Sequence, residues 1–594
     1  MRKYEKKLLQ IKEDNQQYEA FQSSDNTVVL AGPGSGKTTV LTMKIVNLLM
    51  EIKEPRGLAC VTFSNEAAKE FKKRLRELGV RERNNVFLGT VHSFCIAEVL
   101  IPFAKLYPHY GIPLPLRIIS NKKKNILFQQ VRAELGIQER DLSSTEMDSE
   151  RSSSLSGQSK VNIATYDLAA KAAVLYEEKL MKMGVVDFIS IVKFATQFIQ
   201  NEEYVRNCLE AKFPWILIDE YQDLGRPLHE MILALMKGTK SHFFSVGDPD
   251  QSIYGFNGAV PDYLLELYAL PNMRSIKLET NYRSNQDIIN ASEIALNSPV
   301  KRNYQAGTRI NEKARFDFHV CEGEIHEQYE HVVNWVIPNC LESGIPREEI
   351  AVLVAGKAEL KGLSELFDEK GIPYYLVKHE FERTQVVMWL ENCSLWLSNS
   401  QEVSFESLFL FWKSLLIKHD IDISGKRIMV EKRKLYDLLK TSEAKSENLC
   451  EWIECLLDKS GLKQLLDKSD TYPDEVDNLE NLLNVAREGK FTSFSIRDFG
   501  QLGKPSKQVT ISTRHSSKGL EFEAVILLGL EEGYFPSFRS TTQRKIEEEH
   551  RILFVCVSRA KSRCYLVRSK IRNGRWKQPS IFWKALFDWD TQRP

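Results

Sequence analysis

A glycine-rich stretch, AGPGSGKTT at 31–39, is the part of the sequence best suited to hold a chain of phosphates. It follows an apolar run and precedes a helical pattern, so its glycines can turn backbone N–H groups toward phosphate oxygens at a helix N-terminus. In such a loop Lys37 reaches the β- and γ-phosphates, and the hydroxyl of Thr38 binds Mg²⁺. The sequence therefore predicts a nucleoside triphosphate site formed by Gly32, Gly34, Ser35, Gly36, Lys37, Thr38 and Thr39.

An acidic stretch, ILIDEYQD at 216–223, offers the second half of a hydrolytic site. An acid directly after a buried strand is well placed to hold Mg²⁺, so we assign that role to Asp219. Glu220 beside it can accept the proton of an attacking water. Taken alone, the stretch is as often a surface-facing acidic turn, but the phosphate loop upstream favours the catalytic interpretation.

Hydrolysis also needs positive charge near the γ-phosphate while the transition state forms. Arg283 in ETNYRSNQD and Arg559 in FVCVSRAK are candidates. A lone arginine is usually a solvated side chain, and spacing alone singles out neither of them.

The stretch GDPDQSIYGFNG at 247–258 combines a polar cluster with two aromatic residues, Tyr254 and Phe256. The polar side chains suit the phosphate end of a nucleotide, whereas the rings can stack on nucleobases of any sequence. The alternative is that both rings belong to the core, which is less favoured because a polar lead-in is poor core sequence. The stretch therefore indicates a link between a nucleotide site and a nucleic-acid track.

Composition limits the classes of protein that the chain can belong to. Its 594 residues exceed the size of one hydrophobic core, so we expect about four domain-like units. The net charge is only +1, so a nucleic-acid surface must be a local basic groove. The ten cysteines include no Cys-x-x-Cys pair, which argues against a zinc or iron–sulfur site. With no long apolar run and no signal-like start, we expect a cytoplasmic protein with no membrane contact.

Apolar runs that alternate with helical patterns predict an α/β fold with mostly parallel sheets. A first set of strands is expected at TVVLA (27–31), LACVTF (58–63) and WILIDE (215–220). We expect a second set at RSIKLE (274–279), EIAVLVA (349–355), QVTIST (508–513) and EAVILLGL (523–530). Two helix-rich stretches, 96–190 and 396–500, interrupt these sets and are predicted to be insertions.

In their order along the chain, the motifs resemble those of superfamily 1A DNA helicases of the UvrD/Rep/PcrA type. The matches are QYEA (17–20) to the glutamine motif, VTFSNEAAKEF (61–71) to Ia, GTVHSF (89–94) to Ib, DEYQD (219–223) to the acidic box, VGDPDQSIYGFNGA (246–259) to III, NYRS (281–284) to IV, FERTQV (381–386) to IVa, TRHSSKGLEFEAVILLGLEEGYFP (513–536) to V and EEEHRILFVCVSRA (547–560) to VI. The matches span nearly the whole chain, which makes the resemblance specific.

The resemblance implies two RecA-like P-loop NTPase motor domains, 1A and 2A, each with a mainly helical insertion, 1B and 2B. The expected limits are residues 1–95 and 191–277 for 1A, 96–190 for 1B, 278–395 and 501–594 for 2A, and 396–500 for a reduced 2B. ATP and Mg²⁺ would bind in the cleft between the motor domains.

Further roles come only from the resemblance. In the ATP site it implies that Gln17 reads adenine, and Gln16 is left open as the alternative. It also implies that Tyr282 stacks on adenine and that Glu521 contacts the ribose or the catalytic end. It also implies that Gln222 and Gln251 sense the γ-phosphate and that Arg283 and Arg559 are arginine fingers. For DNA it implies contacts from Phe63, Thr90, His92, Tyr254, Phe256 and His515.

The sequence departs from the family pattern in motif III, where Phe256 and Asn257 replace the usual tryptophan and arginine. The missing arginine removes a charge between the ATP site and the DNA groove, which puts their coupling in question. Arg514 stands in motif V where an apolar residue is usual. We hypothesise that it restores a positive charge near this junction.

The implied activity is ATP-dependent 3′→5′ translocation along single-stranded DNA with unwinding of duplex, including tailed duplex. The polarity rests wholly on the resemblance. The alternative is a DNA- and ATP-sensing regulatory subunit that activates a separate nuclease, as in anti-phage systems of the Gabija type; a repair partner is also left open. A degenerate ATPase that serves as a scaffold is disfavoured because the catalytic side chains are intact.

Overall fold

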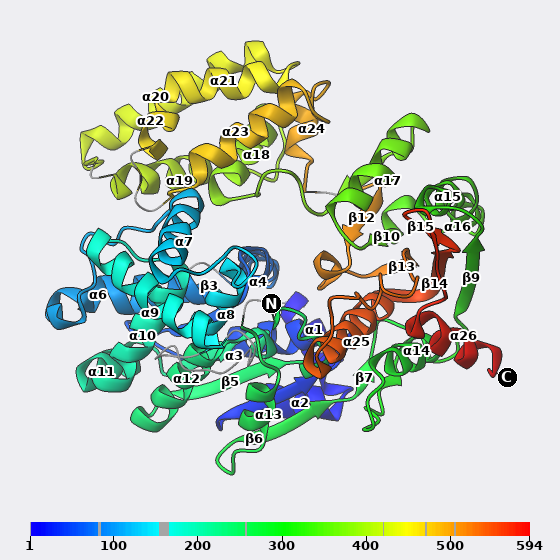
Figure 1. Ribbon diagram of the computed structural model, residues 1–594. Coiled ribbons are helices and arrows are strands. Elements are labelled where there is room, and N and C mark those ends of the chain that lie inside the picture. Colours follow the sequence, from blue (N-terminus) through cyan, green and yellow to red (C-terminus); the bar gives the residue numbers. More distant parts are fainter. Residues whose placement is uncertain are drawn as a thin grey trace.

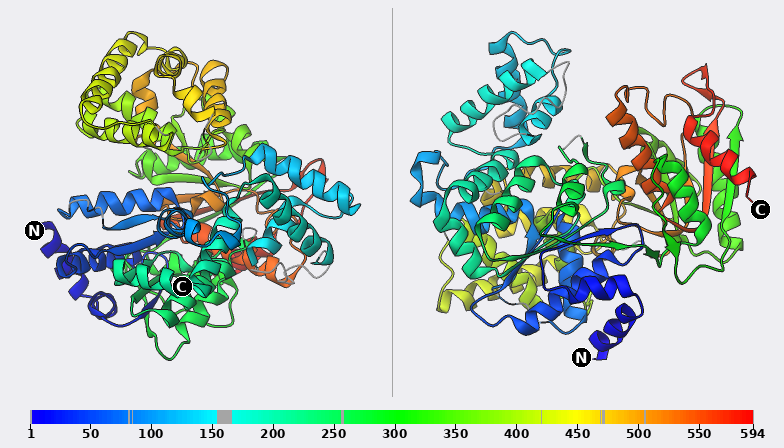
Figure 2. Two further views of the ribbon diagram at one scale, coloured as in Figure 1. Left: turned by 90° about the vertical axis from the view of Figure 1, so that its left-hand side faces the viewer. Right: turned by 90° about the horizontal axis from the view of Figure 1, so that it is seen from below.

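The computed structural model describes residues 2–80, 83, 85–153, 166–255, 258–419, 421–467, 469, 472–503 and 506–593. Two six-stranded sheets, each entirely parallel, form the centres of two bodies (Figure 1, Figure 2). The α/β class and the parallel sheets expected from the alternating patterns are confirmed, and the architecture is consistent with two RecA-like motor domains.

The first sheet has the order β3-β2-β4-β5-β1-β6. Its strands are β1 Thr27–Ala31, β2 Leu58–Thr62, β3 Phe87–Thr90, β4 Trp215–Ile218, β5 His242–Gly247 and β6 Arg274–Leu278. The helices around it are α1 Arg2–Lys12, α2 Asn15–Gln22, α3 Lys37–Glu51, α4 Asn65–Glu77, α5 Val91–Phe94, α10 Phe188–Asn201, α11 Glu203–Lys212, α12 Arg226–Gly238 and α13 Asp262–Tyr268. The strands predicted at 27–31, 58–63 and 215–220 are confirmed.

One strand was assigned to the wrong sheet from sequence. We expected 274–279 in the second set, but β6 pairs in parallel with β1, with Thr27 opposite Arg274 and Ala31 opposite Leu278. The assignment is wrong because an apolar strand pattern records burial but not its partner strand. β6 closes the first sheet, and the chain then crosses to the second body through residues 279–285.

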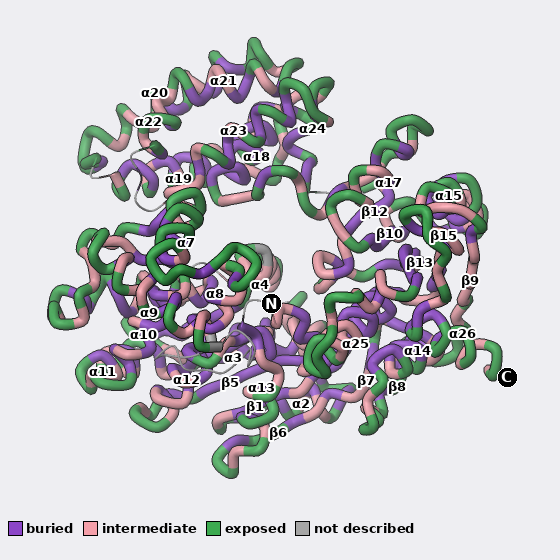
Figure 3. Tube along the Cα trace, viewed as in Figure 1, coloured by how far each residue is buried: buried purple, intermediate pink, exposed green. Residues whose placement is uncertain are grey.

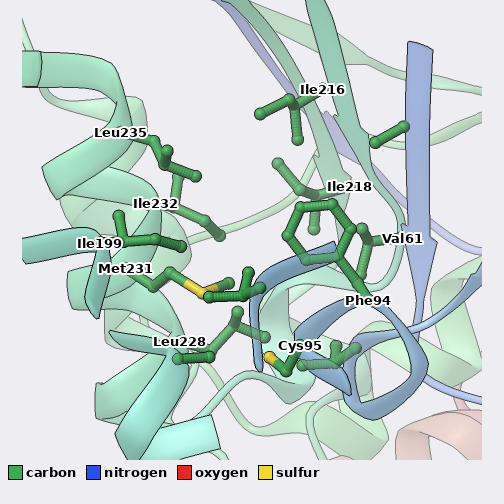
Figure 4. Close-up of a cluster of buried hydrophobic side chains, with 14 of the residues drawn as sticks. Val61, Phe94, Cys95, Ile199, Ile216, Ile218, Leu228, Met231, Ile232 and Leu235 are labelled. Carbon is green, nitrogen blue, oxygen red and sulfur yellow. The ribbon is translucent and has the colours of Figure 1, made fainter. Parts of the chain in front are cut away.

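Apolar side chains of β2, β4, α10 and α12 form one core of the first body (Figure 4). Ile216 and Ile218 point from β4 toward Ile232 and Leu235 of α12, and Ile199 of α10 joins them. On the opposite face of the sheet, α3 and α4 pack on β1, β2 and β5. Burial on both faces explains why these strands are almost uniformly apolar.

The second sheet has the order β11-β12-β10-β13-β14-β9. Its strands are β9 Arg315–Cys321, β10 Ile350–Val354, β11 Tyr374–Leu376, β12 Val509–Thr513, β13 Phe522–Leu527 and β14 Ala560–Ser569. Its helices are α14 Gln286–Leu296, α15 Ile325–His331, α16 Ile337–Glu342, α17 Lys357–Glu369, α25 Gln543–Val557 and α26 Ile581–Thr591. The short pairs β7 Thr280–Asn281 with β8 Gln305–Ala306, and β15 Ile571–Arg572 with β16 Arg575–Trp576, complete the strands.

Two helical regions extend from the sheets. The first contains α6 Ile101–Phe103, α7 Asn121–Leu135, α8 Ser144–Ser153 and α9 Tyr166–Met183. The second contains α18 Gln385–Leu397, α19 Phe405–Lys418, α20 Lys426–Ser442, α21 Leu449–Ser460, α22 Leu462–Asp467, α23 Glu475–Arg487 and α24 Ile496–Gly500. Each region has its own apolar core, and exposed residues cover the outer sides of the helices (Figure 3).

The domain limits remain predictions, although the cores bear on one of them. α18 lies on the 2A side of the proposed limit at 395, yet it packs its buried side chains into the core of the second helical region. The two helical regions touch where the N–H of Asn121 donates to Asp474 Oδ1 at 2.7 Å. Among the described helices, none combines the length and the apolar character needed to cross a bilayer.

Candidate nucleotide site and nucleic-acid interface

The glycine-rich loop joins β1 to α3, and Lys37, Thr38 and Thr39 form the first residues of that helix. Gly36 has φ +83°, which an L side chain rarely adopts. A Cβ placed on Gly36 would lie 2.6 Å from Gln17 Nε2, so the close approach of α2 also requires glycine here. The Ser35 hydroxyl donates to the Gly32 carbonyl at 2.8 Å and closes the turn.

Gln17 and Tyr282 both lie against this loop. Gln17 Nε2 donates to the Ser35 carbonyl at 2.9 Å, and the Tyr282 N–H donates to the Gly34 carbonyl at 2.9 Å. The Tyr282 hydroxyl also donates to Asp14, the N-cap of α2, at 2.7 Å. Gln16 instead accepts the N–H of Glu279 at 2.8 Å. Of the two glutamines left open by the sequence, Gln17 is the one that contacts the phosphate loop.

The carboxylate of Asp219 is buried at the end of β4, and its Oδ1 has no hydrogen-bond partner. Burial, followed by the charge of Glu220, raises the pKa of Asp219. An orphaned, buried carboxylate oxygen fits a hard cation such as Mg²⁺, which commonly takes one or two carboxylates together with substrate phosphates. The described residues contain no group of three or more His, Cys, Asp or Glu side chains that could hold a metal by themselves. The Asp219 carboxylate therefore suits an ion whose other ligands come from a nucleotide, and the Thr38 hydroxyl at the start of α3 remains the second ligand predicted from the sequence.

Glu220 has a left-handed backbone with φ +53°, which is uncommon for a residue other than glycine. Its Oε1 lies 3.5 Å from Lys37 Nζ. Burial by itself raises the pKa of Glu220, but the ammonium groups of Lys37 and Lys518 outweigh it and lower that pKa. Glu220 is therefore an ionised carboxylate beside Lys37, the lysine predicted to bind the phosphates.

Two glutamines connect the acidic turn to the loop after β5. Gln222 Oε1 accepts the N–H of Asp248 at 2.9 Å, and its amide nitrogen donates to Glu220. Gln251 Nε2 donates to Asp248 Oδ2 at 2.6 Å. Asp248 thus holds both predicted γ-phosphate sensors in one hydrogen-bonded chain.

Both predicted arginine fingers come from the second body or the crossing segment and lie at this site. Arg559 is buried, and its Nη2 donates to Gln251 Oε1 at 3.3 Å, across from one sheet to the other. Burial, followed by the charge of Arg283, lowers the pKa of Arg559 to about 9. Arg283 Nε donates to Glu521 Oε2 at 2.7 Å, so in this structure Glu521 pairs with one of the two predicted arginine fingers.

Sequence reasoning missed Lys518, which links the two bodies. Its Nζ donates to the Gln251 carbonyl at 2.8 Å and pairs with Asp223. The same ammonium group lies 5.1 Å from the centre of the Tyr254 ring, within the range of a cation–π contact. The available signal was a lysine within the motif V stretch TRHSSKGLEF.

Sequence reasoning also missed a strap at residues 302–304 that covers the phosphate loop. A Cβ placed on Gly32 would lie 2.5 Å from the Tyr304 ring, so the ring packs directly on that glycine. Arg302 Nη2 donates to Asp250 Oδ1 at 2.8 Å and ties the strap to the loop after β5. No local signal marks these residues, since they lie between two motifs.

Two of the rings proposed for nucleobase stacking lie together. Phe63 and Tyr254 stack on each other, with ring centroids 5.5 Å apart and planes 14° apart. Phe63 remains 37% exposed. Phe256 and Asn257 lie outside the described residues.

Two other predicted DNA contacts, Thr90 and His92, lie at the end of β3 and in α5. Thr90 lies opposite Thr62 in the first sheet, and its hydroxyl caps α5 by accepting the N–H of Ser93 at 3.3 Å. The rings of His92 and Phe188 form a T-shaped pair with their centroids 5.1 Å apart. Burial lowers the pKa of His92 to about 4. Phe188 is 51% exposed and is a further ring that the sequence did not single out.

The motif V turn places His515 and Arg514 differently. His515 begins a short 3₁₀ turn, His515–Ser517, and burial lowers its pKa. Arg514 turns inward: it donates to the carbonyls of Leu528 at 2.7 Å and Gly529 at 3.2 Å. Its guanidinium also lies 3.9 Å from the Phe535 ring centre. The hypothesis that Arg514 replaces the missing charge near motif III is therefore wrong, because this charge is used inside the second body.

The comparisons with known proteins agree with this arrangement. The UvrD/REP helicase N-terminal domain matches residues 13–271, and the UvrD-like helicase C-terminal domain matches 276–414 and 422–570. Similar proteins include the ATP-dependent DNA helicase PcrA of Staphylococcus epidermidis and that of Staphylococcus aureus. Each is 24% identical to this chain over an alignment 633 residues long, and the alignment covers 96% of this chain and 86% of the relative. Because the two family domains account for most of its length, the chain belongs to the UvrD/REP family of helicases.

Proposed function

We propose that the chain is an ATP-dependent motor that moves 3′→5′ along single-stranded DNA and unwinds duplex ahead of it. The observation that carries this proposal is the pair of contacts across the bodies at Gln251, from Arg559 and from Lys518. Gln251 begins the stretch that leads to Tyr254, so the ATP site and the aromatic stack share one loop. A change at the γ-phosphate would therefore reach the rings directly.

The chemistry assigned to the site is hydrolysis of the terminal phosphoanhydride. A water oxygen forms a bond to the γ-phosphorus while the bond from that phosphorus to the bridging oxygen of the leaving ADP breaks. Glu220 accepts the proton of the water, and Lys37, Arg283 and Arg559 neutralise the charge that develops. When bound, Mg²⁺ would supply further charge neutralisation, held by Asp219 and Thr38.

Movement would follow from differential contacts between the two nucleotide states. With ATP bound, the γ-phosphate gives Gln251 and Arg559 a shared partner, which favours closure of the two bodies. After hydrolysis that partner leaves, and the bodies can separate. Lys518 would transmit this change to Tyr254, whose stack with Phe63 opens or closes to admit a nucleobase. Base–aromatic stacking contributes about 1–3 kcal/mol per base, enough to hold a strand between steps.

The decisive experiment compares two tailed duplexes with the purified chain, ATP and Mg²⁺. A duplex with a 3′ single-stranded tail should be unwound, and one with a 5′ tail should remain intact. The opposite preference would overturn the proposed polarity. Parallel ATPase assays with single-stranded DNA, with single-stranded RNA and without nucleic acid would identify the strand that the motor follows.

The same assays test the regulatory alternative, in which the chain senses DNA and ATP for a separate nuclease. That role requires ATP binding with slow turnover and weak unwinding by the chain alone. Strong turnover stimulated by single-stranded DNA, together with unwinding by the purified chain, would count against it.

A further inference from the structure

Lys44 carries an ammonium group that is buried between the nucleotide-binding elements of the first body. The residue lies on α3 and is 2% exposed. Its Nζ donates to the carbonyl of Phe21 in the last turn of α2 at 3.0 Å and to that of Ser23, the C-cap of α2. The same ammonium lies 5.0 Å from the ring centre of Trp215 on β4 and 5.8 Å from that of Phe244 on β5.

A buried lysine is a costly way to fill space in a core. Burial lowers the pKa of Lys44 to about 8, which reflects the loss of water around the ammonium. Two carbonyl acceptors and two ring faces offset part of that cost. A methionine would fill a similar volume without any desolvated charge, so the packing alone does not account for a lysine. The hydrogen bonds from its ammonium group to the end of α2 account for a lysine at this position.

α2 depends on such anchors because it is short. It has eight residues, and isolated helices below about 12–15 residues are marginal in water. Its N-terminal end is held through Asp14, which accepts a hydrogen bond from the Tyr282 hydroxyl at 2.7 Å. Its C-terminal end is held by Lys44. Gln17 lies between these two anchors and meets the phosphate loop at Ser35.

We propose that Lys44 is a positioning residue for recognition of the nucleotide base. By capping the last turn of α2 from the helix that follows the phosphate loop, it sets the placement of Gln17 relative to that loop. Lys44 does not touch the nucleotide itself; it acts through α2. The inference rests on the proposed function in taking Gln17 as the residue that reads adenine.

The test compares steady-state hydrolysis of ATP with that of ribose 5′-triphosphate, which carries the phosphates and sugar without a base. In Lys44→Met we expect the KM for ATP to rise about tenfold, because hydrogen bonds from a charged donor to α2 are lost. The kcat for ATP should change less than about twofold, because contacts to the base contribute equally to binding of the substrate and of the transition state. Both constants for ribose 5′-triphosphate should be unchanged, so the preference for ATP shrinks. Lys44→Arg, which keeps charged donors, should restore that preference, and Lys53→Met, at an exposed site beyond α3, should have no effect.

Two outcomes overturn the inference. An equal loss with both substrates means that Lys44 only stabilises the fold, and an unchanged preference for ATP means that α2 needs no such anchor. Gln17→Ala is measured alongside. If it keeps the preference for ATP, the role of Gln17 in the proposed function fails, whereas a loss of preference in Lys44→Met would still assign base recognition to α2.

Discussion

At the scale of single residues, the site depends on placing opposite charges in a buried space. Glu220 is kept ionised by Lys37 and Lys518, although burial opposes this. Asp219, one residue earlier, has an oxygen with no partner and a raised pKa. Two adjacent carboxylates thus have environments suited to two roles, one as a base and one as a cation ligand.

Replacement of Glu220 with Gln should leave ATP binding intact and reduce kcat by about 100-fold or more, because the amide cannot accept the proton of the water. Equilibrium binding of a fluorescent ATP analogue and a single-turnover ATPase assay would separate the two effects. Glu77→Gln, at the exposed end of α4, serves as the matched control. Normal hydrolysis by Glu220→Gln would mean that another residue is the base.

Replacement of Arg559 even with lysine should impair ATP hydrolysis. Its planar guanidinium donates to the Val555 carbonyl at 2.9 Å and to Gln251, a pattern that one ammonium group cannot reproduce. An arginine finger contributes about 10³–10⁵ in kcat, so Arg559→Lys should lose at least about 100-fold. Arg575→Lys, at an exposed position of β16, is the control for the assay. An Arg559→Lys enzyme with wild-type kcat would exclude the proposed finger.

At the scale of elements, the first helical region is held by a buried ion pair between α8 and α10. Arg151 donates to Asp187 at 2.7 Å and 2.9 Å, and its guanidinium lies 4.7 Å from the Tyr176 ring centre. Asp187 also caps α10 by accepting the N–H of Ser190. The pair therefore fixes the angle at which the helical region leaves the first body.

Loss of one partner should be costly. Arg151→Met removes the cation that donates two hydrogen bonds to the buried Asp187 carboxylate, so that Lys124, whose Nζ lies 3.8 Å from that carboxylate, is left to balance it. The change should lower the local free energy of unfolding by about 3–5 kcal/mol. Adding Asp187→Asn, which removes the charge and keeps the cap, should recover part of that loss. Urea denaturation, together with limited proteolysis of α8 and α9, would measure both the loss of stability and its partial recovery. If Arg151→Met alone were as stable as the wild type, the ion pair would contribute nothing to the free energy of unfolding.

The same pair predicts an acid-sensitive component of stability. Burial raises the pKa of Asp187, but Arg151 outweighs it and lowers that pKa below its ordinary value. Because the folded-state pKa lies below the unfolded one, this stability is present above about pH 4 and is lost as the pH falls further. Urea unfolding between pH 2 and pH 7 should show the loss in the wild type and a smaller loss in Arg151→Met, in which Lys124 and the N–H of Ser190 are left to lower the pKa of Asp187. Parallel pH profiles in the two proteins would refute the assignment.

At the scale of the whole molecule, two parallel sheets meet where their connecting loops carry the chemistry. Arg559 and Lys518 reach from the second body to Gln251, and the crossing segment 279–285 passes Tyr282 over the phosphate loop. Each contact joins residues that are far apart in the chain. The proposed site therefore draws its residues from both bodies.

Lys518→Met should uncouple the nucleotide site from the rings. Removal of the ammonium eliminates its hydrogen bond to Gln251, its ion pair with Asp223 and its contact with Tyr254. The ratio of DNA-stimulated to basal ATPase should fall about tenfold, since a hydrogen bond from a charged donor contributes about 1.5–3 kcal/mol. Lys570→Met, which removes an exposed ion pair with Glu322, is the control. An unchanged ratio would place the coupling elsewhere.

The nucleotide half of the site could be predicted from sequence because its determinants are local. A glycine-rich turn after a strand, or an acid at a strand end, is encoded by contiguous residues, and in the structure the loop 31–39 joins β1 to α3 and the turn at 219–220 follows β4, as those patterns predict. The arginines could be named only through the order of the motifs, since their spacing carries no signal.

Other features depended on how distant segments pack. The pairing of β6 with β1, the inward turn of Arg514, the bridge made by Lys518 and the strap at Tyr304 have no local signature. Side-chain patterns record whether a residue is buried, but they do not record which distant segment buries it. The sequence by itself thus determined the chemistry of each half of the site, whereas only the tertiary structure decided which residues join the halves.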